Sequence, residues 1–421
     1  MTVLRPLNLL ILSSVLLSAQ ALALEADFRL KWFTTGSALP KHDVQRQVAG
    51  TPAYDHTVDL RMMFKQDFGP VRLLVDHSTV LLSGDGVELG RDPSSAVDQT
   101  VTNDARRWVD LTWDIEDGSR HQSFHRLDRL ALQWQPGDWS ITVGRQAVSW
   151  GGGIVFQPLD LFSPFSPTVV DRDYKAGDDL LLIDRLLSNG HDLQLLHVVR
   201  RDLQGHVTDE VSSTAFKWHG YAGAFEFELV GAQHYSERVF GGSLRMPLGQ
   251  ALLRTDVVAT EYESVIDGGR EWQVSGVVNV DVTFMLGGRN VYAFGEYFHN
   301  DWGVDELPAS IVELPVPLQV RLERGELFNL MKDYVAVGGS IEWHPLVNHT
   351  VTVISNLHDS SHLLQMEVAF DPSDHQSLQF GWLEPLGRAG DEFGGVGLFD
   401  TEPLVTTGGA SRIYLRWVYF L

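Results

Sequence analysis

Every second residue is apolar over several stretches of the chain, and the residues between them are mostly polar or charged. Residues 57–65, 225–229 and 278–284 show this alternation most regularly. A period of two predicts β-strands with two chemically different faces. The pattern fits two kinds of protein: a soluble sheet, whose apolar face is the core, and a transmembrane barrel, whose apolar face contacts lipid and whose polar face lines the lumen.

The lengths of the connections separate these two alternatives. Short turns rich in Gly, Pro, Asn or Asp alternate with long connections along the chain. Outer-membrane barrels have short periplasmic turns and longer external loops, whereas a soluble sandwich has no reason to sort its loops in this way. The short turns are at 66–70, 135–138, 188–192, 221–224, 247–250, 286–289, 344–349 and 371–375. The long connections are near 36–56, 82–126, 149–178, 201–211, 262–271, 300–333 and 386–409, with two short exceptions near Ser236 and Asp359.

Counting strands under this alternation predicts an all-β fold, a transmembrane antiparallel β-barrel of about 18 strands with both termini periplasmic. The predicted strands are 27–35, 57–65, 71–81, 127–134, 139–148, 179–187, 192–200, 212–220, 225–234, 239–246, 251–261, 272–285, 290–299, 334–343, 350–357, 363–370, 376–383 and 410–421. A 16-strand barrel is the alternative if weak segments such as 179–187 are not strands. Residues 108–115 also alternate, but counting them would break the order of connections. They are therefore assigned to the external connection 82–126, as a hairpin or an inward-folded piece.

The last residues of the chain support a barrel independently. Ile413, Leu415, Trp417, Tyr419 and Leu421 occupy alternate positions up to the end of the sequence. This segment resembles the terminal strand that outer-membrane proteins present to the barrel-assembly machinery, although the final position of that pattern is usually Phe. The resemblance implies the assembly machinery as a partner.

The N-terminal segment and the composition set the cellular context. One basic residue, an apolar run at 9–17 and small residues at 19–23 predict a secretory signal peptide over residues 1–23, followed by a single barrel domain over 24–421. The run is too short for a spanning helix, which needs about 20 apolar residues. With no cysteine, the chain has no disulfide, thiolate metal site or covalent haem attachment. A formal charge of −23 argues against nucleic acid as a partner.

A sequence resemblance points to the same architecture. The segment Trp139–Gly153, WSITVGRQAVSWGGG, contains a Gly-Arg-Gln triplet followed by an aromatic residue and glycine. It resembles a strand of proteobacterial porin-like outer-membrane barrels, including alginate-export-type channels. Residues 125–130 and 324–328 are similar to segments of uncharacterised members of such barrels. The resemblance implies a barrel in the cell outer membrane and names no solute.

The polar faces of the predicted strands supply the candidate pore-lining residues. They are Arg29, Lys31, Asp59, Arg61, Lys65, Arg72, Asp76, Arg129, Lys217, Glu226, Glu228, Arg245, Arg254, Asp256, Asp281, Glu296, Glu342, Glu367, Arg412 and Arg416. Basic and acidic side chains are nearly balanced in this set, so the acidic excess of the chain is expected mainly in turns and external loops. Such charges either set the selectivity of a pore or pair with one another and brace the wall.

Arg145 does not fit the alternation, because it falls on the same face as the lipid-facing Trp139, Ile141 and Val143. Two explanations are open. Arg145 emerges at the external rim, where a long side chain can reach water, or Gly144 hosts a β-bulge that turns the side chain inward.

The connection 149–178 is the candidate constriction. It begins with three glycines and continues with an apolar, proline-rich stretch that contains Phe156, Leu159, Phe162 and Phe165. Long loops in compact structures are usually functional or disordered, and this one is too apolar to extend into water. We expect it to fold into the barrel and narrow it; the alternative is a loop packed over the rim.

The sequence predicts a channel rather than an enzyme. It contains no Gly-x-Ser-x-Gly, His-Glu-x-x-His or P-loop motif, and His358 with His362 makes only a weak metal site. We therefore expect no catalytic residues, no cofactor and no metal, and outer-membrane lipid and lipopolysaccharide as partners. The leading hypothesis is passage of small polar or amphiphilic solutes. An export conduit for a polysaccharide or other secreted product, and a barrel enzyme or scaffold, are the alternatives; the oligomeric state is left open.

Overall fold

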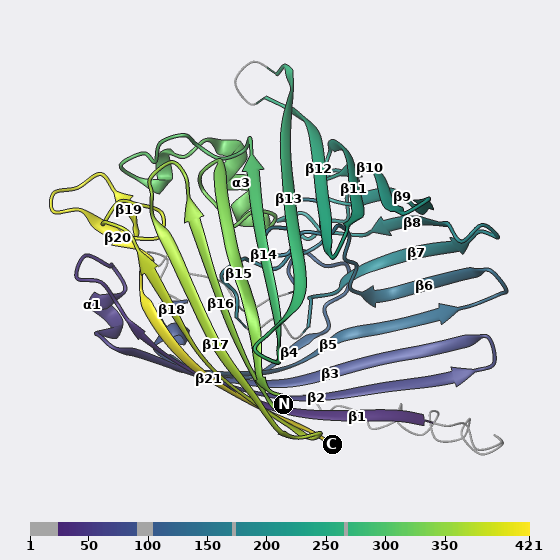
Figure 1. The fold of residues 1–421 in the computed structure, drawn as a ribbon, viewed down its shortest axis with the longest axis horizontal. Helices are drawn as coiled ribbons and strands as arrows, with labels where there is room; N and C mark the ends of the chain where they lie inside the picture. The colour runs from purple at the N-terminus through teal and green to yellow at the C-terminus, as the bar shows by residue number, and fades with distance from the viewer. Residues whose placement is uncertain (1–23, 91–103, 171–173, 265–267) are drawn as a thin grey trace, which may run out of the picture.

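The fold is a single closed ring of antiparallel strands (Figure 1). The computed structural model describes residues 24–90, 104–170, 174–264 and 268–421. The strands of the ring are β1 Leu24–Ala38, β2 Ala53–Phe68, β3 Val71–Gly84, β5 His121–Trp134, β6 Trp139–Gln146, β7 Asp178–Leu186, β8 Asp192–Val198, β9 Ser213–Ala222, β10 Phe225–His234, β11 Glu237–Leu248, β12 Ala251–Glu263, β13 Arg270–Leu286, β14 Arg289–Asn300, β15 Asp333–His344, β16 Val347–Asn356, β17 His362–Ser373, β18 Gln376–Leu386 and β21 Ser411–Phe420. Each strand pairs with its neighbours in sequence, and β21 pairs with β1 to close the barrel.

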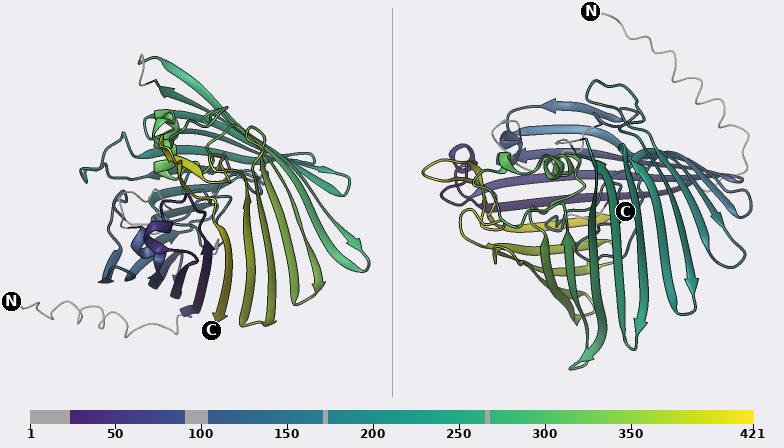
Figure 2. Two further views of the ribbon diagram at one scale, coloured as in Figure 1. Left: turned by 90° about the vertical axis from the view of Figure 1, so that its left-hand side faces the viewer. Right: turned by 90° about the horizontal axis from the view of Figure 1, so that it is seen from above.

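The predicted 18-strand barrel is confirmed, and the 16-strand alternative is wrong. Each of the 18 predicted segments lies on a different strand of the ring, including 179–187, which corresponds to β7 and pairs with β6 and β8. The predicted signal peptide, residues 1–23, lies outside the described residues. Figure 2 shows how strongly the strands are tilted, with β1–β3 crossing the direction of β14–β17 at a steep angle, as closure of a barrel requires.

The largest difference between a predicted and an observed strand boundary is at the start of β5. β5 begins at His121, six residues before the predicted start at 127. Its extra length pairs with β4, Thr112–Asp117, which is an additional strand outside the ring. The alternating residues 108–115 therefore belong partly to a hairpin in the external connection, one of the two forms expected for them.

The short non-barrel elements lie at one end of the barrel (Figure 1). They are α1 Arg46–Ala49, α2 Asp85–Leu89, the 3-10 helix η1 Ile311–Glu313, α3 Val316–Arg324, β19 Val396–Phe399 and β20 Val405–Thr407. All of them belong to long connections, whereas the other end carries the short turns. Within the described part of the chain, no helix has the length and apolar character needed to cross a membrane.

Burial is inverted relative to a soluble protein, because the apolar strand faces point outward. Leu132, Phe240 and Val337 are each more than half exposed, whereas the inward-facing Arg61 and Asp256 are 2% and 0% exposed. An outward apolar band with a charged interior is the arrangement of transmembrane barrels. The two larger buried apolar clusters therefore lie inside the ring, where the connection between β6 and β7 meets the wall. A third, smaller cluster lies in the connection between β14 and β15.

Candidate functional site

The connection between β6 and β7 enters the barrel. We call its described residues, 147–170 and 174–177, the inward loop. Phe156, Leu159 and Phe162 of this loop are 2%, 0% and 3% exposed, and Phe165 is partly buried. Phe156 stacks on Phe298 of β14 with ring centroids 4.5 Å apart. The apolar residues of the loop thus contact the inner wall and do not pack over the rim.

Three carboxylates of the opposite wall hold the loop by its backbone. Six consecutive N–H groups, those of Gly151–Phe156, donate to Glu228 on β10, Asp256 on β12 and Glu296 on β14. Glu296 alone accepts three of these hydrogen bonds, at 2.7 to 2.9 Å. Hydrogen bonds to charged acceptors are about twice as strong as neutral ones, so these carboxylates fix the loop across the lumen.

The glycines at the start of the loop make this contact sterically feasible. Gly151 has a φ of +89°, which side chains rarely allow. A Cβ atom on Gly153 would lie 1.8 Å from the carbonyl oxygen of Phe156. The run of glycines therefore permits a tight backbone turn that presents successive N–H groups to the wall.

The second half of the loop is held by a buried ion pair and by aromatic contacts. Lys175 Nζ lies 2.5 Å from Asp160 Oδ1, and both residues are buried. Burial raises the pKa of the Asp160 carboxyl to about 6, although Lys175 opposes this shift. Tyr174 lies between two arginines of the wall, with Arg29 and Arg61 at 4.7 and 3.9 Å from its ring centroid.

An apolar barrier separates two cavities inside the barrel. Trp150, Leu159 and Phe162 of the inward loop pack against buried side chains of β7 to β12. On the side of the short turns lies a cavity of about 590 Å³, lined by residues of β6 to β11. On the external side lies a cavity of about 50 Å³, beneath α3. The inward loop therefore lies between the two cavities.

The predicted pore-lining residues lie on the inward faces of their strands. The cations Arg61, Lys65, Arg129, Arg412 and Arg416 belong to the wall formed by β1, β2, β5 and β21, while Glu226, Glu228, Asp256, Asp281 and Glu296 belong to β10–β14. The remaining predicted pore-lining residues are Arg72, Asp76, Lys217, Arg254 and Glu342. Of these, Arg72 and Glu342 lie near the end of the barrel with the short turns. Several of these charges pair: Arg254 contacts Asp281 at 2.5 Å, and Arg61 contacts Asp128.

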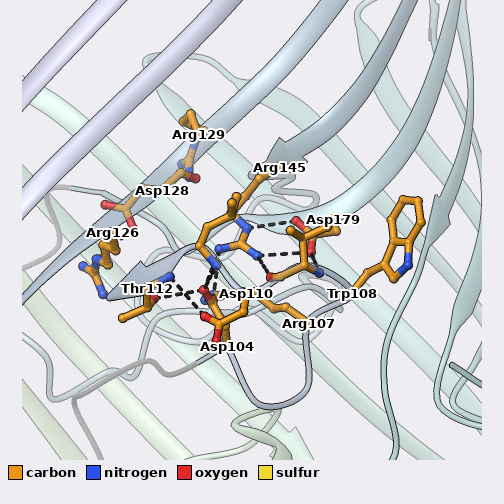
Figure 3. Close-up of polar contacts among 12 residues, drawn as sticks. Asp104, Arg107, Trp108, Asp110, Thr112, Arg126, Asp128, Arg129, Arg145 and Asp179 are labelled. Carbon is orange, nitrogen blue, oxygen red and sulfur yellow. Dashed lines mark hydrogen bonds and ion pairs between the residues drawn. The ribbon is translucent and has the colours of Figure 1, made fainter. Parts of the chain in front are cut away.

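Sequence reasoning missed a buried cluster around Arg145 (Figure 3). The Arg145 guanidinium contacts Asp179 of β7 at 2.9 Å and Asp104 of the external connection at 3.0 Å. All three side chains are nearly completely buried. Asp104 also accepts from Arg107 at 2.6 Å. The only sequence signal for this cluster was the position of a charged residue on a lipid-facing strand face.

Neither of the two explanations proposed from the sequence for Arg145, emergence at the rim or a β-bulge at Gly144, is fully correct. Arg145 is 2% exposed and does not reach water at the rim. Gly144 has a φ of +124°, and a Cβ atom there would lie 2.1 Å from the carbonyl oxygen of Leu130, yet the pairing of β6 with β5 and β7 continues without a register shift. The glycine thus allows a close strand approach without a bulge, and the segment that carries Asp104 covers the guanidinium.

Arg145→Met is expected to lower barrel stability by about 3–5 kcal/mol, because it leaves Asp104 and Asp179 buried without their main counter-charge. Equilibrium unfolding of the purified barrel in denaturant measures the change. Arg185→Met is the matched control, since Arg185 lies exposed over the Trp139 ring and is expected to contribute less than about 1 kcal/mol. Equal stability of Arg145→Met and the native protein would contradict this role for the cluster.

A second buried carboxyl, Glu392, joins the long connections. It accepts hydrogen bonds from the backbone N–H of Leu330 at 2.8 Å, from the Tyr334 hydroxyl at 2.6 Å and from the Asn356 amide at 2.6 Å. Burial raises the pKa of Glu392 to about 7. The raised pKa means that the folded arrangement favours the protonated form.

This shift predicts a pH dependence of the external connections. The stabilisation linked to Glu392 is fully present below about pH 4.5 and is lost as pH rises through 7, with a magnitude on the order of 3 kcal/mol. Amide hydrogen exchange of residues 387–395, corrected for the intrinsic effect of pH, should therefore show greater protection at pH 5.5 than at pH 8. Glu392→Gln should abolish this difference; the same difference in that variant would assign it to another group.

The histidines considered for metal binding have other partners. His358 Nε2 lies 2.8 Å from Asp333, and His362 Nδ1 lies 2.9 Å from the Ser355 hydroxyl. Over the described ranges, no group of three or more His, Asp or Glu side chains has the geometry to hold a metal ion.

Comparison with known proteins identifies the fold. No family model and no curated protein sequence matches the chain. Among solved structures, OccAB1 of Acinetobacter baumannii is similar over 94% of this chain and 96% of its own, with 10% identity and a TM-score of 0.55. OccK5 (OpdH) of Pseudomonas aeruginosa is similar over 94% of this chain and 98% of its own, with 10% identity and a TM-score of 0.54. OpdK of the same organism, solved with vanillate, is similar over 94% of this chain and 98% of its own, with 10% identity and a TM-score of 0.52. The chain therefore has the 18-strand β-barrel fold of these proteobacterial outer-membrane porins.

Proposed function

We propose that this protein is a passive channel for small polar or amphiphilic solutes, restricted by the inward loop. The observation that carries the proposal is the loop itself, which crosses a charged lumen between two cavities and is held there by noncovalent contacts. An 18-strand barrel is wide enough for an aqueous channel unless something occupies it. A loop folded into that width restricts passage to small solutes.

The distribution of lumen charge supports polar rather than purely apolar solutes. Arg29 and Arg61 pair with Asp59 and Asp128 in the wall of β1, β2 and β5, while the carboxylates of β10–β14 hold the loop. Two of the similar structures contain small organic carboxylates, vanillate in OpdK and glucuronate in OccK2 (OpdF). Molecules of that size match the scale of the 590 Å³ cavity.

Swelling of proteoliposomes in isosmotic solutes tests the proposal. Vesicles that contain the folded barrel should swell in small polar solutes such as glycerol or glycine, and swelling should slow steeply as solute size increases. Empty vesicles provide the baseline. Swelling at the baseline rate in every small solute would refute the channel.

An export conduit is the second candidate, favoured by the resemblance of Trp139–Gly153 to alginate-export-type channels. The same segment leads from β6 directly into the inward loop, so a periplasmic partner that displaced the loop would open the widest path. Genes for polysaccharide or efflux machinery beside this one would favour the conduit. Solute flux through the isolated barrel would favour the passive channel.

We also propose the partners that the outer surface implies. The exposed apolar band is expected to contact outer-membrane lipid and lipopolysaccharide. At the end with the short turns, Arg185 lies over the Trp139 ring and Arg289 lies over the Trp343 ring, as expected for residues at the membrane interface. The alternating strand β21 is expected to be the segment that the barrel-assembly machinery recognises.

A further inference from the structure

The larger cavity lies directly beneath the apolar barrier, on the side of the short turns. Its lining includes five carboxylates, Asp138, Asp184, Asp192, Glu226 and Glu228, together with Lys217, His219 and Arg245. Trp150, which forms part of the barrier, donates its indole N–H to Gln194 in the cavity wall at 3.1 Å. A solute on this side of the barrel would therefore contact these groups next to the inward loop.

Most of the charges in the cavity already have partners. His219 contacts Asp192 at 2.5 Å and Glu226 at 3.2 Å. Arg245 contacts Glu226 and lies 3.6 Å from Glu228. Glu228 in addition accepts the backbone N–H of Gly151 at 3.3 Å. These groups stabilise the wall and the inward loop, and their existing contacts leave them few free hydrogen-bonding positions for a solute.

Asp138 is exposed in the turn between β5 and β6, whereas two groups of opposite charge deeper in the barrel lack ion-pair partners among the described residues. Lys217 is 8% exposed, and within the described part of the chain no hydrogen bond or ion pair ends on its ammonium group; its nearest aromatic contact is the Trp150 ring, 5.8 Å away. Asp184 lies opposite Gln194 in the sheet, and its Oδ1 is buried without a hydrogen-bond partner in any of the described ranges. Unsatisfied charged atoms in a low-dielectric site are costly unless a ligand completes them.

The strand register places these two groups side by side on one face. Asp184 of β7 is directly opposite Gln194 of β8, and Gln194 is directly opposite Lys217 of β9. Adjacent strands lie about 4.8 Å apart, so the backbones of Asp184 and Lys217 are about 10 Å apart. No ion pair joins the two side chains within the described residues, and both line the same cavity. The gap between them is wide enough for a small solute to bridge.

We propose that Asp184, Gln194 and Lys217 form a binding subsite for a dipolar solute that carries an ammonium and a carboxylate group a few ångströms apart. The ammonium group binds Asp184 Oδ1, the carboxylate binds the Lys217 ammonium, and the Gln194 amide lies between them. The subsite deepens the proposed channel function, on which it rests, by naming a solute class. A plain carboxylate would satisfy Lys217 and leave Asp184 unmatched and repulsive.

Binding of three small probes of similar size tests this subsite. L-alanine carries both charges, propionate only the carboxylate and ethylamine only the ammonium. Isothermal titration of the folded barrel in detergent should show L-alanine binding at least tenfold more tightly than either other probe. Asp184→Asn and Lys217→Met should each weaken L-alanine binding tenfold or more. Asp374→Asn in a short turn and Arg289→Gln on the outer face are controls that should leave it unchanged.

The outcomes separate the subsite from the channel. Equal binding of propionate and L-alanine, or L-alanine binding that survives Asp184→Asn, would overturn the subsite. If a variant fails to fold, which heat-modifiable gel mobility reveals, the exchange D184K/K217D keeps both charges in the cavity and should restore part of the affinity. Ion conductance without L-alanine binding would refute the subsite alone, whereas L-alanine binding in a barrel that passes no ions or solutes would refute the channel alone.

Discussion

Deletion of residues 154–167 is expected to raise single-channel conductance severalfold while the barrel remains folded. The deleted residues include Phe156, Leu159 and Phe162, which fill the lumen. Strand pairing does not depend on them, because β6 and β7 pair with each other and with β5 and β8 through their own backbones. An 18-strand barrel without an inward obstruction holds an aqueous channel, as porins of 16 to 18 strands do.

A matched deletion and a point variant sharpen this test. Deleting residues 87–98 shortens a different external connection and should leave conductance near the native value. Glu296→Ala removes the acceptor of three loop N–H groups and should give larger or noisier currents without shortening the chain. If conductance is unchanged by the first deletion and rises with the second, the wrong loop has been chosen. If neither deletion changes it, loops do not restrict the lumen.

The double variant Trp417→Asp with Tyr419→Asp is expected to abolish assembly of the barrel. Both side chains lie on the outward face of β21, and their strand pairs with β1 and β18 to close the ring. A charge facing lipid costs up to about 2–4 kcal/mol at the bilayer midplane for basic side chains and less for acidic ones or near the interfaces. Because β21 pairs with both β1 and β18 to close the ring, two such charges oppose closure.

The yield of heat-modifiable, protease-resistant barrel in outer-membrane fractions measures the effect. Trp417→Phe with Tyr419→Phe keeps the face apolar and should assemble normally. Normal yield of the aspartate variant would show that these side chains do not contact lipid, and the inward and outward faces of β21 would have to be reassigned.

The strands were predictable because their signal is local. A period of two in residues 57–65 places Arg61 and Lys65 on one face without knowledge of any partner strand, and the alternation of connection lengths then fixes the count. The start of β5 was misplaced because its first residues, which pair with both β3 and β4, lie in a segment that the order of short and long connections assigned to an external loop. The apolar composition of residues 149–178 was also enough to predict that this connection packs against other parts of the protein and does not extend into water.

The contacts that define the site were not predictable in the same way. Glu296 was assigned to the lumen, but its bond to Ile154 joins residues 142 positions apart in the sequence. The Arg145 cluster depends on Asp104, 41 positions away in the external connection between β3 and β5. Such pairings follow from closure of the barrel, which brings distant strands together, and no local pattern in the chain encodes them.

Planar-bilayer recording of the purified, folded native protein tests the central claim most directly. The account predicts stepwise increases in current as single barrels insert, each with a small ohmic conductance that the inward loop keeps below that of the 154–167 deletion. Insertion of a barrel that is folded by heat-modifiable mobility and yet gives no conductance above the baseline of the bare membrane would contradict it.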